Sequence, residues 1–322
     1  MVLVLCDHSE GAPTDVSLQA LTLARGLAAG EPVHALLVGP GGREAAAALG
    51  AHGVATAHVA EHDALAAYAP DAWARIVGDT AERIGAHVVV APGSERGNEV
   101  LARAAARAGE PLAANCIAAT PGQPIELTRI RWGGSLLEEA RLHAGSRAFL
   151  TVAPHALAAD ASAGGAAAVE PFAAELDEAD LVVRVLERVA AAAGGVSLAD
   201  AKVVVTGGRG VGSPEGFAPI EDLAAVLGGA VGCSRAVTMA GWRSHTDQVG
   251  QTGTKLAPEI YIACGVSGAT QHLAGAKGAK RILAVNTDPE APIMSSADYA
   301  VIGDLHEVVP AIAAEIRRLR GA

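Results

Sequence analysis

The chain alternates short runs of β-branched and other apolar residues with longer alanine-rich amphipathic segments. In the first part of the chain this pattern predicts strands at 2–6, 33–38, 54–59 and 87–91, and helices at 14–29, 42–49, 70–84 and 98–107. Strands that are separated by helices pair in parallel, with the helices packed on the faces of the sheet. The alternation therefore predicts a parallel-sheet α/β domain.

The same alternation returns in the last third of the chain. Strands are predicted at 202–206, 260–264, 281–285 and 299–302, and helices at 217–227, 271–276 and 307–319. A chain of 322 residues is long enough for two domains. We therefore predict an N-terminal parallel-sheet α/β domain at 1–196 and a C-terminal doubly wound α/β domain at 197–322, with a helix at 180–192 leading from one to the other.

The middle of the chain has a different pattern. Residues 125–132 and 147–152 are rich in strand-forming side chains, and the Gly133-Gly134 turn and a polar segment lie between them. They are predicted to be antiparallel strands at the edge of the first sheet. Residues 158–168 have no periodicity and are expected to form a surface loop.

Composition excludes several classes of function. The formal net charge of −11 argues against a nucleic-acid partner, which would require clustered Lys and Arg. The N-terminal residues have no basic segment before the first apolar run, so we expect no signal peptide, no membrane insertion and a cytoplasmic location. The four cysteines lie far apart without ligand-like spacing, and no metal site is expected.

Three glycine-rich segments in the last third occupy positions suited to binding a nucleotide. They are 206–212, 248–253 and 265–272, and the first and third directly follow predicted strands. Open α/β sheets bind ligands at the carboxyl ends of their strands, where glycines let backbone N–H groups approach a phosphate. Taken alone, the first segment is at least as easily a tight turn with a solvated Arg209.

Two more segments, 286–293 and 297–305, complete an ordered set that resembles the FAD-binding domain of the electron transfer flavoprotein alpha subunit. The resemblance is dense from about 201 to 309 and looser over the first half. It implies FAD as cofactor and a beta subunit, packed on the N-terminal domain, as partner. It also implies a redox carrier, without a small-molecule substrate of its own, that relays electrons from flavin dehydrogenases, such as those of fatty acid β-oxidation, to a downstream oxidoreductase or quinone-linked acceptor.

The resemblance also implies roles for individual residues. Arg209 would contact the pyrophosphate, Arg235 would stand over the flavin ring, the Thr252 hydroxyl would face N5, and His272 would hydrogen bond toward O2. The last three would tune the flavin, and none is assigned a role as an acid, base or nucleophile. The implied cofactor contacts are Arg209, Ser234, Arg235, Val249, Gly250, Gln251, Thr252, Ser267, Gly268, Ala269, Thr270, Gln271, His272, Asn286, Asp304 and Leu305.

Alternatives remain open from the sequence. Ser234 and Arg235 also fit a helix start with a surface arginine, and His272 fits a structural histidine. The chain could be a nucleotide-binding regulatory module that kept the fold, or a bifurcating member of the family with a second FAD on the beta side. Residues 92–97 also resemble a phosphate loop, which we assign to structure or to the subunit interface.

Overall fold

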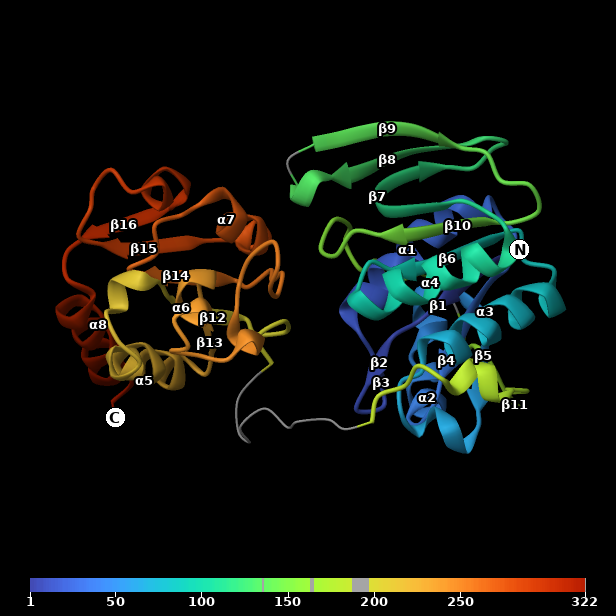
Figure 1. Ribbon diagram of the computed structural model, residues 1–322, viewed down its shortest axis with the longest axis horizontal. Coiled ribbons are helices and arrows are strands. Elements are labelled where there is room, and N and C mark those ends of the chain that lie inside the picture. Colours follow the sequence, from blue (N-terminus) through green and yellow to red (C-terminus); the bar gives the residue numbers. More distant parts are fainter. Residues whose placement is uncertain (135, 163–164, 187–196, 322) are drawn as a thin grey trace. The chain divides into compact units, whose positions relative to one another are not determined.

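The computed structural model describes residues 1–134, 136–162, 165–186 and 197–321 (Figure 1). The chain divides into two compact units, residues 1–188 and 189–322. Residues 187–196, which include the end of the predicted helix 180–192 and border the predicted boundary at 197, lie outside the described residues. Where that helix was expected to begin, the structure has a short 3-10 helix, Glu178–Leu181, and no α-helix over the described residues 182–186.

The first unit is built on a large mixed sheet. Its described strands lie in the order β11 (Ala168–Ala173), β5 (Val54–Glu61), β4 (Val33–Val38), β1 (Val2–Leu5), β6 (Val88–Pro92), β10 (Ala148–Val152), β7 (Leu112–Thr120), β8 (Ile125–Arg131) and β9 (Leu136–Leu142). All neighbours from β11 to β7 pair in parallel, and β8 and β9 continue the sheet antiparallel. A small hairpin, β2 (His8–Ser9) with β3 (Ala12–Pro13), follows β1.

Helices cover both faces of this sheet, as the alternation predicts. The helices α1 (Asp15–Ala28) and α2 (Gly42–Ala46) contribute to one core, and α3 (Pro70–Ile84) and α4 (Glu95–Ala108) contribute to the other. Successive side chains of β1 point to opposite faces, so Val2 and Val4 enter the first core and Leu3 and Leu5 the second. A strand buried on both faces therefore reads as a continuous apolar run.

One predicted edge strand is instead central. β10 lies between β6 and β7, pairs in parallel with both, and is buried along its whole length. Only β8, of the two segments predicted to be antiparallel, is antiparallel to its neighbours. The prediction for residues 147–152 is therefore wrong, because the apolar run of β10 is that of a fully buried parallel strand.

The second unit is a doubly wound α/β domain, as predicted. Its strands lie in the order β13 (Ala230–Cys233), β12 (Val203–Gly207), β14 (Ile260–Cys264), β15 (Ile282–Asn286) and β16 (Tyr299–Ile302), and every pair is parallel. The helices α5 (Ala218–Leu227) and α8 (Leu305–Arg320) pack together on one face, and α7 (Thr270–Ala276) packs on the other (Figure 1). A short helix, α6 (Arg235–Met239), follows β13.

The strand order places a binding crevice. The chain runs from β12 outward to β13 and then returns to β14 on the other side of β12. In such sheets the loops after the two central strands diverge at their carboxyl ends and leave a crevice at this topological switch point. A binding site is therefore expected at the carboxyl ends of β12 and β14.

Candidate functional site

A cleft of about 640 Å³ lies at this switch point. Its walls come from the segments that follow β12, β13, β14 and β15, together with the loop 248–252. Most of the residues predicted to contact the cofactor line it. These are Arg209, Ser234, Arg235, Val249, Gly250, Gln251, Thr252, Ser267, Ala269, Gln271, His272 and Asn286.

The loops after β12 and β14, which both contribute residues to the lining of the cleft, are closely packed backbone to backbone. Gly208 N–H donates to the Cys264 carbonyl at 2.9 Å, and Gly210 N–H donates to the Gly265 carbonyl at 3.1 Å. A Cβ atom at Gly208 would lie 2.2 Å from the Gly265 oxygen, so no other residue fits this position. The glycines of segment 206–212 thus hold two strand ends together as well as opening the cleft.

The loop 248–254 is fastened to the start of α7. Gln251 N–H donates to the Gln271 carbonyl and Thr254 N–H donates to the Gln248 carbonyl, both at 2.7 Å. Gly250 has φ of +146°, and a Cβ atom there would lie 3.0 Å from the Gln271 oxygen. Thr252 and His272 are therefore held in one cleft by a loop whose path requires glycine.

Gln248, which sequence reasoning did not select, connects Thr252 to α6. Its side chain is buried, with Nε2 donating to Thr252 Oγ1 at 3.0 Å and Oε1 accepting from Thr238 Oγ1 at 2.6 Å. Gln248 also lines the cleft, whereas Thr238 is not among the lining residues. The hydroxyl of Thr252 is thus the exposed end of a hydrogen-bonded chain of side chains.

His272 enters the cleft from the first turn of α7 and is buried. Burial lowers the pKa of its imidazole to about 4, although the nearby Val249 carbonyl acts to raise it, so the ring is neutral at pH 7. The Tyr261 hydroxyl lies 2.6 Å from Nε2, and Nδ1 has no hydrogen-bond partner among the described residues. The tautomer in which Tyr261 donates to Nε2 puts the ring proton on Nδ1.

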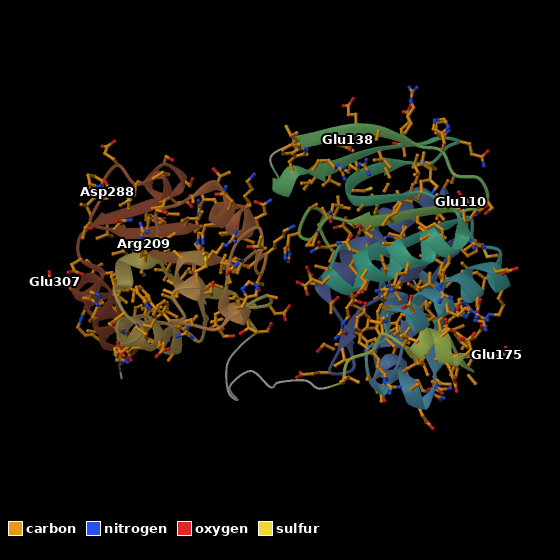
Figure 2. The ribbon with its side chains drawn as sticks, in the orientation of Figure 1. Glu110, Glu138, Glu175, Arg209, Asp288 and Glu307 are labelled. Carbon is orange, nitrogen blue, oxygen red and sulfur yellow. The ribbon has the colours of Figure 1, made fainter. Side chains whose placement is uncertain are left out.

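Two guanidinium groups at the cleft are available to an anion. Arg209 and Arg235 are exposed, and neither side chain is paired with a carboxylate in the part of the chain that the structure describes. Arg209 follows β12, and Asp288 on the loop after β15 contributes a carboxylate to the lining; both are labelled in Figure 2. The cleft therefore combines cations, neutral donors and glycine backbone, which suits a phosphate-containing cofactor.

Four residues predicted to contact the cofactor are not among the lining residues. Gly268 is buried, and a Cβ atom there would lie 2.3 Å from Ile293 N. Asp304 caps α8 by accepting from His306 N–H at 2.8 Å, and Leu305 is buried in the core on that face. Thr270 is exposed at the first position of α7. Their contact with the cofactor stays a prediction.

Several lining residues escaped the sequence reasoning. They are Gly210, Ala236, Gln248, Gly265, Val266, Asp288, Ala291 and Pro292. All of them except Ala236 lie inside the segments 206–212, 248–253, 265–272 and 286–293 named from the sequence, although none was selected as an individual contact, and Ala236 directly follows Arg235. Asp288 follows Asn286, itself a predicted contact at the end of β15, and could have been found by the same signal.

The phosphate-like loop of the first unit is satisfied by the protein itself. Ser94 caps α4 by accepting from Gly97 N–H at 2.9 Å, and its hydroxyl donates to Asp7 Oδ2 at 2.5 Å. A buried carboxylate thus already lies at the N-terminus of α4. This supports the structural interpretation of residues 92–97.

The thiol of Cys233 is buried. Burial raises the pKa of the Cys233 thiol to about 12, and the negative charge of Asp247 contributes to this increase. The thiol is therefore protonated and inert. The described residues hold no group of three or more potential metal ligands. Among the described helices, none combines the length and the apolar character needed to cross a bilayer.

Comparison with known proteins agrees with the geometry. Residues 2–177 match the family described as the electron transfer flavoprotein domain, and residues 197–277 match the electron transfer flavoprotein FAD-binding domain. An electron transfer flavoprotein subunit alpha from Mycobacterium tuberculosis is 40% identical over 325 residues, which cover 99% of each chain. Subunits of the same name from Thermoanaerobacterium thermosaccharolyticum and Bacillus subtilis are each 34% identical and cover 99% of this chain and 98% of their own length.

The cleft fits the cofactor that this family binds. The unpartnered Nδ1 of the buried His272, the unpaired guanidiniums of Arg209 and Arg235, and the glycine-built floor are the features that an FAD would satisfy. The matches extend over nearly the whole chain and include the FAD-binding domain itself. The chain therefore belongs to the electron transfer flavoprotein alpha family, and its cofactor is FAD.

Proposed function

We propose that this chain is the alpha subunit of a heterodimeric electron transfer flavoprotein that holds FAD in the cleft between β12 and β14. It accepts reducing equivalents from flavin dehydrogenases and passes them to a downstream oxidoreductase or a quinone-linked acceptor. On this account it is a redox carrier in the cytoplasm, and dehydrogenases of fatty acid β-oxidation are the first candidate donors. The bound cofactor supplies the electron chemistry.

The arrangement of Arg235 and His272 at one cleft carries this proposal. A flavin gains negative charge when it is reduced, and an unpaired guanidinium beside it stabilises that charge. His272 is neutral, so it serves as a hydrogen-bond donor to a flavin oxygen and adds no second charge. Among the described residues that line the cleft, no Ser, Thr or Cys is hydrogen-bonded to His272, whose hydroxyl partner is the fully buried Tyr261 outside the lining, and this favours electron transfer over hydrolysis.

A partner subunit is expected on the first unit. The relatives are named as alpha subunits, and membership of their family implies a beta subunit. The end of the β8–β9 hairpin exposes three large apolar side chains, Trp132, Leu136 and Leu137. Exposed apolar groups clustered in this way are typical of a surface that another chain covers.

The proposal is tested by electron transfer into the complex. The chain is co-expressed with a candidate beta subunit, and the purified complex is mixed anaerobically with a substrate-reduced flavin dehydrogenase while the flavin absorbance is followed. Loss of the oxidised-flavin absorbance, and its return when a quinone-linked acceptor is added, are expected. A complex that contains FAD but exchanges no electrons with any flavin dehydrogenase would instead indicate the regulatory module, and two FAD per heterodimer would indicate the bifurcating variant.

A further inference from the structure

The chain of side chains behind Thr252 contains a hydroxyl with two acceptors. Thr238 Oγ1 lies 2.6 Å from Gln248 Oε1 and 3.0 Å from the carbonyl oxygen of Arg235. A hydroxyl has one hydrogen and can donate to only one of them at a time. Gln248 Nε2 in turn donates to Thr252 Oγ1 at 3.0 Å, and the Gln248 side chain has no other hydrogen bond within the described residues.

These contacts permit two complete hydrogen-bond arrangements. In the first, Thr238 donates to Gln248 Oε1, Nε2 donates to Thr252, and the Thr252 hydroxyl is left to donate into the cleft. In the second, the amide is turned over, so that Thr252 donates to Oε1, Nε2 donates to Thr238, and Thr238 donates to the Arg235 carbonyl. Thr252 is then left to accept a hydrogen bond from the cleft.

We propose that Gln248 is a positioning residue whose amide reverses with the oxidation state of the bound FAD. This inference rests on the proposed function and on the prediction that Thr252 faces the flavin N5. The N5 atom is an acceptor in the oxidised ring and carries a hydrogen in the reduced ring. The first arrangement of the protein matches the oxidised ring, and the second matches the reduced ring.

Because the Gln248 amide is buried, reversal lets it keep a hydrogen-bond partner at each end in both oxidation states. Gln248 is 2% exposed, so water does not replace a partner that its amide loses. With the amide fixed in the first arrangement, Thr252 can still accept from the reduced ring through its second lone pair, but its own hydrogen then has no acceptor; reversal supplies one, Gln248 Oε1. Because Thr238 has a second acceptor in the Arg235 carbonyl, the amide can turn over without leaving a buried group unpaired.

Thr238→Val distinguishes the two arrangements by a count of hydrogen bonds. Without the Thr238 hydroxyl, the first arrangement loses one hydrogen bond, the one to Gln248 Oε1. The second loses two, the one from Nε2 and the one to the Arg235 carbonyl; each arrangement leaves one atom of the buried amide unpaired, Oε1 in the first and Nε2 in the second, so the difference is the one further hydrogen bond. The oxidised cofactor is therefore favoured by about one net hydrogen bond, which changes the ratio of oxidised to reduced FAD affinity about fivefold.

The test measures the midpoint potential and the FAD affinity of the complex with its beta subunit. It compares wild type, Thr238→Val and Thr238→Ser, and each of the three is measured both with Thr252 intact and with Thr252→Val. Thr238→Ser retains the hydroxyl and is the matched control. Thr238→Val is expected to lower the potential by the equivalent of that fivefold ratio, and Thr238→Ser to leave it at the wild-type value. In the Thr252→Val background the effect of Thr238→Val should vanish, since the hydroxyl through which the amide acts on N5 is then absent.

An unchanged potential in Thr238→Val, or a shift that persists in the Thr252→Val background, would overturn the proposal. Equal potentials for wild type and Thr252→Val would also overturn it, by removing Thr252 from N5, while the FAD content of the wild type tests the proposed function separately. If Thr238→Val does not fold, Thr238→Ala is compared in the same cycle, because it removes the same hydroxyl with a smaller side chain.

Discussion

His272 illustrates how one buried side chain links the stability of the second unit to its chemistry. Its neutral state follows from burial, which disfavours the charged imidazolium. The same burial places the ring against Tyr261, and Nδ1 has no other hydrogen bond of standard geometry within the described residues. Keeping the imidazole neutral therefore lowers the free energy of unfolding at low pH.

That cost gives a prediction about pH. The imidazole pKa is about 4 when folded and about 6.5 when exposed, so the unfolded chain takes up the proton first as the pH falls. The titration of His272 leaves the free energy of unfolding unchanged above pH 6.5 and lowers it between pH 6.5 and 4, by up to about 3 kcal/mol. Urea unfolding at pH 7 and 4.5 should show that His272→Gln removes most of this loss, whereas the exposed His306→Gln does not; equal losses in the two variants would contradict the assignment.

A second residue-scale prediction concerns Arg235. Its exposed guanidinium is not paired with a carboxylate within the described residues, so its charge acts on the cleft with some solvent screening. Arg235→Ala should destabilise reduced FAD relative to oxidised FAD by roughly 1 kcal/mol and lower the midpoint potential. Arg235→Lys retains the charge and should lie nearer to the wild type, so potentials equally lowered in both variants would indicate lost geometry rather than lost charge.

At this scale the sequence predicted the residues that face the cleft but not those behind them. Arg209, Thr252 and His272 lie in the glycine-rich segments 206–212, 248–253 and 265–272. Arg235 was implied only by the resemblance, and the structure brings all four to one cleft. Thr238 gave no such signal, because its role depends on a contact across the fold with Gln248. Contacts of this kind become visible only when the loops are placed in space.

Among the elements, the loop 248–254 and the helix α7 form the most constrained pair. The loop can reach the start of α7 only because Gly250 adopts a backbone angle that other residues avoid and leaves space for the Gln271 carbonyl. The position of Thr252 is therefore set by the backbone two residues before it. Replacing Gly250 with alanine, which adds one methyl group, tests this constraint.

Gly250→Ala should lower both FAD affinity and stability. Backbone strain costs about 1–3 kcal/mol, and the added Cβ must also displace the Gln271 carbonyl. Gly241→Ala is the matched control, because Gly241 has φ of +72° with nothing within 4 Å of an added Cβ. It should lose stability by about 1 kcal/mol while FAD affinity stays unchanged; equal FAD affinities in the two variants would contradict the role given to Gly250.

Whether an element was predicted from the sequence depended on the residue types that it contains and on the residues that bound it. The strands β4, β14 and β16 were predicted to the residue, because their apolar runs are bounded by turn residues. β7 is rich in alanine and lacks a strand-like sequence, and β11 is an exposed edge strand that contains Pro171, so neither was predicted. β10 was assigned to the wrong position because pairing direction depends on the whole sheet.

For the whole molecule, the two units have separate cores. The two core clusters of the first unit contain only residues before 188, and those of the second contain only residues after 197. The cleft lies wholly in the second unit. Binding of FAD in this cleft therefore stabilises the second unit directly.

Calorimetry of the isolated chain tests this division. Two unfolding transitions are expected, and FAD at about 100 times its dissociation constant should stabilise one of them by about 2.7 kcal/mol. The variant Gly250→Ala should shift the same transition and leave the other in place. A single transition that moves as a whole with FAD would show instead that the units unfold together.

The most direct test of the account is the FAD content of the complex when the cleft is blocked. Ala269 is an exposed, small lining residue, and Ala225 is exposed on α5 away from the lining residues. Wild type and Ala225→Trp, each co-expressed with the beta subunit, should show an oxidised-flavin spectrum with the same FAD content, and Ala269→Trp should contain one FAD fewer per heterodimer. Equal FAD content in all three would contradict the placement of the cofactor in this cleft.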